Sequence, residues 1–223
     1  MVFTKKSARA VGKPTGKTYT LRQLASALVR FVPLAPYAGM VWGLRRMEPS
    51  LREQVMLTVA RANGCRYCSY IHQEWAIRSG ASDEEIAQLE GTDPAAFDRG
   101  RWSALVYARS LAENDFGTLP PEIVADAARH HNAGERHNIE AVALVMTIVN
   151  RSANTMDALL CRLRGEPASQ SLAAELVITA GLLAVGPVIV PALSGILRKS
   201  PWRLLREFRA FTAGKTPNDA QAA

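Results

Sequence analysis

Apolar side chains recur at intervals of three and four residues through most of the chain, as they do in amphipathic helices. The apolar residues from Leu21 to Val32 follow this spacing directly after Thr20, a residue type that often caps a helix N-terminus. No segment alternates between apolar and polar residues with turn residues on both sides, as a half-buried strand would. The pattern therefore predicts an all-α, multi-helix domain over residues 20–165.

Cap and turn residues divide this region into separate helices. Ser50 and Glu53 form a capping-box pattern, and Asn63-Gly64 ends the helix that they begin. A second helix starts at once after this turn. The expected helices begin at Thr20, Ser50, Cys65, Ser82, Asp93, Pro120 and Glu140. The last of them, over 140–163, is the longest.

The composition is that of a globular protein with one sizeable core. The chain has 223 residues, of which 48% are hydrophobic and only three are cysteine. This excludes a disulfide-stapled miniprotein and a wholly disordered chain, and it suits a reducing compartment. The uncharged stretch 31–44 follows Arg30 and has no small-residue cleavage site after it, unlike a signal peptide. We therefore expect a cytoplasmic protein.

The positive charge is concentrated at the two ends of the chain. Residues 1–47 contain nine basic side chains and no acidic one, and residues 198–223 contain six basic against two acidic. We expect residues 1–19 to form a flexible basic arm, because they lack apolar periodicity. The basic ends also lack the interleaved aromatic residues of a base-stacking surface, so we expect no nucleic-acid partner.

The region 166–223 contains a hydrophobic segment and a basic tail. Residues 176–197 carry no charge, and as one helix they would be about 33 Å long, enough to cross a bilayer. Pro187 and Pro191 offer another arrangement, a re-entrant hairpin of two arms with both ends in the cytoplasm. A third is a buried helix pair inside an oligomer.

The tail that follows predicts a short amphipathic helix. Its apolar side would contain Trp202, Leu205 and Phe208, and its basic side Arg203, Arg206 and Arg209. Such a helix suits the headgroup layer of a membrane. Residues 176–212 therefore predict contact with an anionic membrane surface, with a merely solubilising tail as the alternative.

The candidate chemistry lies between residues 53 and 72. Cys65, Cys68 and His72 are spaced i, i+3 and i+7, which places them on one helix face. Cys65 stands at the helix start, where free N–H groups and the helix dipole favour a thiolate. His72 can accept a thiol proton, and Glu53 on the preceding helix can orient the imidazole or relay that proton. These four residues suit a dithiol site that reduces peroxides.

Other interpretations of the cysteines remain open. Buried cysteines often pack as small hydrophobic residues, which we also expect for Cys161. Two cysteines and one histidine could be three zinc ligands, but no second pair completes a tetrahedral set. A thioredoxin-type site needs a βαβ context that the chain lacks. A redox-sensing or non-catalytic helical scaffold at a membrane or partner interface is the alternative function.

The pattern of Glu53, eleven residues, and then Cys65-x-x-Cys68-x-x-x-His72 resembles the alkylhydroperoxidase-like branch of the carboxymuconolactone decarboxylase family. The resemblance extends over about residues 35–160 and includes "ALVYARSLAEND" and "IEAVALVMTIVNRSANTM". The best-described alkylhydroperoxidase has a histidine between its cysteines, where this chain has Tyr67. The decarboxylases of the family lack the dithiol pair, so a decarboxylase-type lyase is the less favoured activity.

The resemblance implies an all-helical bundle of the alkylhydroperoxidase-like type that forms a homo-oligomer and uses no metal or organic cofactor. It implies that Cys68 attacks the hydroperoxide, that Cys65 resolves the product, and that His72 and Glu53 relay protons. The partners would be a hydroperoxide substrate and an external dithiol reductant, either a thioredoxin-like or a dihydrolipoyl protein. The chain has no Gly-x-Gly-x-x-Gly pattern with which to take electrons from a nicotinamide itself.

Overall fold

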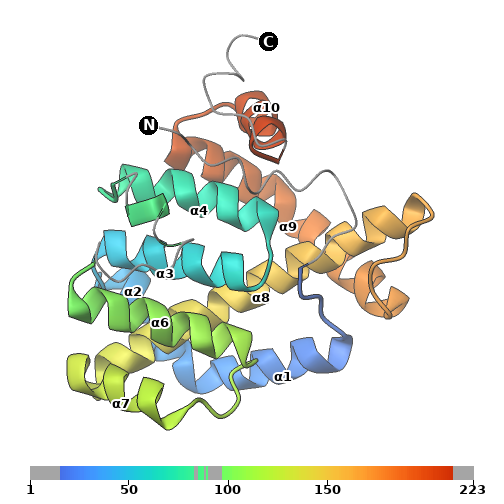
Figure 1. The fold of residues 1–223 in the computed structure, drawn as a ribbon. Coiled ribbons are helices and arrows are strands. Elements are labelled where there is room, and N and C mark those ends of the chain that lie inside the picture. Colours follow the sequence, from blue (N-terminus) through green and yellow to red (C-terminus); the bar gives the residue numbers. More distant parts are fainter. Residues whose placement is uncertain (1–15, 83–84, 88, 90–96, 213–223) are drawn as a thin grey trace.

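The computed structural model describes residues 16–82, 85–87, 89 and 97–212, and it confirms an all-α fold with no strand in these ranges (Figure 1). The helices and one 3₁₀ turn are α1 (Leu21–Phe31), η1 (Val32–Leu34), α2 (Ala35–Gly43), α3 (Pro49–Ala62), α4 (Arg66–Arg78), α6 (Arg99–Glu113), α7 (Pro121–His130), α8 (Ala133–Leu163), α9 (Leu172–Leu197) and α10 (Pro201–Thr212). The predicted hydrophobic C-terminal helix is present as α9.

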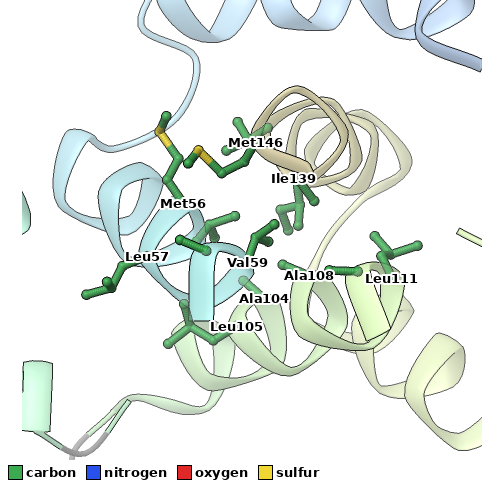
Figure 2. Close-up of a cluster of buried hydrophobic side chains, with 14 of the residues drawn as sticks. Met56, Leu57, Val59, Ala104, Leu105, Ala108, Leu111, Ile139 and Met146 are labelled. Carbon is green, nitrogen blue, oxygen red and sulfur yellow. The ribbon is translucent and has the colours of Figure 1, made fainter. Parts of the chain in front are cut away.

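Helix α8 is the central element of the bundle, and α1, α2, α3, α6 and α9 pack against it. Figure 2 shows the core where α3, α6 and α8 meet, with Val59, Ala108 and Ile139 among the buried side chains. Burying such side chains is the main favourable contribution to folding. The α3 helix that supplies Glu53 is therefore held on two sides by the core.

Several helix ends agree with the sequence and others differ for identifiable reasons. Thr20 caps α1 as predicted. The predicted Ser50–Glu53 capping box is wrong: Pro49 occupies the first helical position of α3, so Ser50 already lies inside the helix. The Glu53 side chain therefore does not serve as part of a capping box. The longest helix begins at Ala133, seven residues before the predicted Glu140, because Asn132 and Glu135 form a capping box there.

The predicted helix start at Asp93 lies outside the described residues. The helix that follows, α6, begins only at Arg99, with the Asp98 side chain accepting a hydrogen bond from the Arg101 N–H. Residues 1–15 of the predicted basic arm also lie outside the described residues. Lys17 and Tyr19, in contrast, are packed against the domain, and Tyr19 is buried against Ala174 of α9. Residues 16–19 thus belong to the folded part of the chain.

The segment predicted as either one helix or a hairpin is one continuous helix. Both Pro187 and Pro191 lie inside α9, so the two-arm hairpin is wrong. Each proline removes one backbone hydrogen bond, yet the flanking turns stay helical. Two stretches of the described chain, Leu21–Gly43 and Leu172–Leu197, are long and apolar enough to cross a membrane by length and composition alone.

Candidate active site

A tight turn between α3 and α4 places the first cysteine at a helix start. Gly64 adopts a left-handed φ of 67°, which glycine tolerates without a side-chain clash, and the chain enters α4 at the next residue. Cys65 is the N-cap of α4, and its Sγ accepts a hydrogen bond from the Cys68 N–H at 3.3 Å. The backbone thus holds Cys65 where a negatively charged sulfur is stabilised by the helix N-terminus.

Cys65 and Cys68 are joined by a disulfide, with their Cα atoms 5.4 Å apart. Both side chains are buried, but unequally: Cys65 is 0% exposed and Cys68 is 6% exposed. The predicted pair is therefore brought into bonding contact, and Cys68 is the member that touches the surface. Cys161 is buried elsewhere and unbonded, as expected for a core residue.

His72 and Glu53 meet across the α3–α4 hairpin. The His72 Nδ1 lies 3.0 Å from Glu53 Oε2, and the Glu53 side chain is only 1% exposed. Arg52 donates two hydrogen bonds to the other carboxylate oxygen, Glu53 Oε1, at 2.9 and 3.0 Å. The ring of Trp75 lies parallel to the imidazole, one helical turn further along α4. These contacts fix the orientation of the imidazole, which is what a proton acceptor beside a thiol requires.

Polar residues of α8 hold the turn that precedes Cys65. The Asn63 side chain donates to Thr147 Oγ1 and accepts from Arg151 Nε, and its backbone carbonyl accepts from Asn154 Nδ2 at 2.9 Å. Nothing in the sequence around the cysteines predicted these three residues as part of the site. Their signal is visible in hindsight, because Thr147, Arg151 and Asn154 are polar residues at intervals of four and three, which places them on one face of the helix.

Asp157 extends the same α8 face to the first turn of α4. Its Oδ1 accepts hydrogen bonds from Arg66 Nη2 at 2.7 Å and from the Tyr67 hydroxyl at 2.9 Å. Burial and the neighbouring Asp157 carboxylate raise the pKa of the Tyr67 phenol, although Arg66 opposes this. Tyr67, the residue between the two cysteines, is thus a neutral donor bonded to α8.

Helix α10 packs on α4 next to this turn. Phe208 stacks on Tyr67 with the ring centres 4.7 Å apart, and the Tyr70 hydroxyl donates to Glu207 at 2.8 Å. Burial alone would raise the pKa of the Glu207 carboxyl, but hydrogen bonds from Lys199, Arg203 and Tyr70 hold it at about 2. Glu207 is therefore a buried anion that ties α10 to α4.

The docked face of α10 differs from the predicted one. Glu207 and Phe208 face α4, whereas Trp202 is 80% exposed and Leu205 is also exposed. The predicted apolar side of Trp202, Leu205 and Phe208 is thus divided between protein and solvent. The reason is the Glu207 ion-pair cluster, which the helical periodicity of the tail alone does not reveal.

Residues 34–114 match the family model of the carboxymuconolactone decarboxylase family. This range contains Glu53, both bonded cysteines and His72. Residues 34–114, called the family domain below, are therefore similar to a carboxymuconolactone decarboxylase family domain. No curated protein sequence and no solved structure matches the chain. The resemblance to this family that we expect for residues after 114, including those of α8, stays a prediction.

The family domain depends on helices outside the matched range to complete its site. All four α8 residues that bind the α3–α4 turn or the first turn of α4 follow residue 114, as does the whole of α10. Within the described part of the chain, no group of three or more His, Cys, Asp or Glu side chains is arranged to hold a metal ion. The site itself brings together the two cysteines, the His72 imidazole and the Glu53 carboxylate.

We predict that the Asn154→Leu substitution lowers the free energy of unfolding by about 2 kcal/mol. The amide of Asn154 donates to the backbone carbonyls of Asn63 and Lys17, and leucine would leave both carbonyls without this donor. Urea denaturation followed by circular dichroism measures the change. Asn150→Leu is the matched control, since neither polar atom of the buried Asn150 has a partner among the described residues. An equal loss of unfolding free energy in Asn154→Leu and Asn150→Leu would contradict the role given to the Asn154 hydrogen bonds.

Proposed function

We propose that the protein is a dithiol peroxidase that reduces hydroperoxides through Cys65 and Cys68. The single observation that supports this most is the disulfide-bonded pair on the helix whose His72 is held by the buried Glu53. A pair that only packed in the core would not need an oriented imidazole on the same helix face. The family domain is consistent with the proposal and also with other activities.

In the first step, the Cys68 thiolate attacks the terminal oxygen of the hydroperoxide. The S–O bond forms as the O–O bond breaks, so that sulfur is oxidised to a sulfenic acid and the peroxide leaves as an alcohol. His72 takes the thiol proton and returns it to the departing alkoxide, directly or through a water molecule. Glu53 positions the imidazole and stabilises the imidazolium.

In the second step, Cys65 attacks the sulfur of the Cys68 sulfenic acid. A disulfide forms and one water molecule leaves, so two thiols and one hydroperoxide give a disulfide, an alcohol and water. The short sequence separation lets the two sulfur atoms meet without movement of the rest of the helix. An external dithiol protein, thioredoxin-like or dihydrolipoyl, then reduces the disulfide by thiol–disulfide exchange.

The unequal burial of the cysteines supports the assignment of their roles. The attacking sulfur must meet a substrate from solution, and Cys68 is the more exposed of the two. The resolving sulfur needs contact only with Cys68, and Cys65 is completely buried beside it. A small or slender hydroperoxide would therefore reach Cys68 first.

The test is a stopped-flow titration of the fully reduced protein with an organic hydroperoxide. We expect rapid loss of two of the three thiols per equivalent of peroxide, with the Cys65–Cys68 disulfide identified by mass spectrometry. Cys161, which is outside the bonded pair, serves as the internal control and should remain reduced. Thiols that survive excess peroxide for many minutes would refute the peroxidase proposal.

A further inference from the structure

Helix α9 exposes apolar side chains along most of its length. Only a narrow stripe is buried, including Ala174 and Ile178 near one end and Leu197 at the other. Leu183 and Val188, between them, are 67% and 74% exposed. The helix is about 39 Å long at 1.5 Å per residue, and it carries no charge between Glu175 and Arg198. Exposed apolar surface of this extent marks an interaction site.

Both ends of α9 are tied to the same domain. At its start, buried Glu175 accepts hydrogen bonds from Arg162 of α8 at 2.7 and 3.0 Å. Just beyond its end, Lys199 forms ion pairs with Glu74 of α4 and with Glu207 of α10. Figure 1 shows the result, with α9 running back along the bundle to α4 and α10. A helix with both ends on one domain cannot cross a bilayer while that domain stays folded.

The charge at the end of α9 matches an anionic surface. Residues 198–212 contain five basic side chains and one acidic side chain, Glu207, which is already bound to Lys199 and Arg203. The outer face of α10 combines exposed Trp202 and Leu205 with exposed Arg206. Tryptophan beside arginine is typical of helices that lie among lipid headgroups.

A second copy of the chain fits this surface less well. At about 100° per residue, exposed apolar side chains lie on more than half of the circumference of α9. They include Leu176, Val177, Leu183, Val185, Val188 and Ile189. One partner helix would cover a single stripe and leave the rest in water, whereas a lipid layer covers the whole exposed half.

We propose that α9 and α10 bind the protein to an anionic phospholipid bilayer, with α9 lying in the plane of the membrane. The exposed half of α9 enters the boundary between headgroups and acyl chains, and the outer face of α10 binds the headgroups. The family domain stays entirely on one side of the bilayer. This inference concerns binding alone and does not depend on the proposed peroxidase activity.

The first experiment is flotation of the full-length protein with sealed vesicles of phosphatidylcholine, with or without phosphatidylglycerol. We expect binding to the anionic vesicles and at least about tenfold weaker partitioning to neutral ones. The Leu183→Ser/Val188→Ser and Arg206→Glu variants should each lower partitioning about tenfold or more. All altered side chains are exposed, so the fold should persist, which thermal melting by circular dichroism would verify.

Val29→Ser/Val32→Ser is the matched control, because these valines are equally exposed but belong to α1 and η1 rather than to α9 or α10. We expect its partitioning to equal that of the wild type. Equal losses in the control and the α9 variant would refute the proposal, because general stickiness would then explain the binding. Failure of the wild-type protein to bind anionic vesicles would also refute the proposal. If the wild type binds no vesicles and forms an oligomer that the α9 variant converts to monomer, the exposed face of α9 is an interface between copies of the chain instead.

Protease accessibility tests the in-plane arrangement. Trypsin added outside sealed vesicles should cleave bound protein on both sides of α9, at Arg164 and at Lys215 beyond α10, because both ends of the helix stay on the outer side. Protection of one of these sites until detergent is added would show a spanning helix and overturn the in-plane arrangement.

Discussion

The Cys68→Ser variant is expected to consume hydroperoxide no faster than protein-free buffer. The serine hydroxyl is far less ionised than a thiol near neutral pH and cannot form a sulfenic acid, so the first step has no nucleophile. Consumption is followed in the presence of a small dithiol as reductant. Of all single changes in the site, this one removes the reacting atom itself, which is why its effect should be the largest.

The Cys65→Ser variant separates the two steps. It should still lose the Cys68 thiol to one equivalent of peroxide, but the product should remain a sulfenic acid that a 1,3-diketone probe labels at Cys68. Cys161→Ser is the control for general thiol loss and should behave as the wild type. Wild-type turnover in Cys68→Ser would eliminate the proposed mechanism, and a sulfenic acid on Cys65 instead would reverse the assigned roles.

We expect the Glu53→Gln substitution to slow thiol loss to peroxide by about 10², the size of effect typical of general acid–base assistance. Glutamine keeps the shape of the side chain but removes the charge that binds both His72 and Arg52. Because Glu53 is a positioning residue, its effect should pass through His72. The measurement is a double-mutant cycle of single-turnover rates with His72→Ala.

In that cycle, Glu53→Gln/His72→Ala should be no slower than His72→Ala alone. Glu48→Gln is the control, since Glu48 lies at the start of the same helix but pairs with Arg101 on the surface. Its rate should be unchanged. Fully additive effects of the Glu53 and His72 substitutions would mean that Glu53 acts independently of His72, which would contradict its positioning role.

The sequence was sufficient to predict the parts of the site that are local. Cys65, Cys68 and His72 share one helix, so their relation follows from the helical repeat. The contact between Glu53 and His72 requires only that two helices joined by Asn63-Gly64 fold back on each other. The capping role given to Ser50 failed because Glu48 is the N-cap and the helix begins at Pro49, so Ser50 already lies inside it.

The parts that escaped prediction depend on contacts between distant segments. Thr147 and Asn154 reach Asn63 across 84 and 91 positions of sequence, and nothing near the cysteines predicts those partners. The orientation of α10 depends likewise on Tyr70, which supplies a hydrogen bond to Glu207 from a helix 137 positions earlier. Helical periodicity identifies a face of a helix, but it does not say which element covers that face.

The stacking of Phe208 on Tyr67 joins α10 to the helical turn that carries the bonded cysteines. Tyr67 lies between the bonded cysteines, so any shift of this turn on reduction of the disulfide would also move the ring on which Phe208 rests. By linkage, any difference in the docking free energy of α10 between the oxidised and reduced forms changes the free energy of reducing the disulfide by the same amount. A surface that binds α10 and loosens it from α4 would therefore also tune how readily the disulfide is reduced.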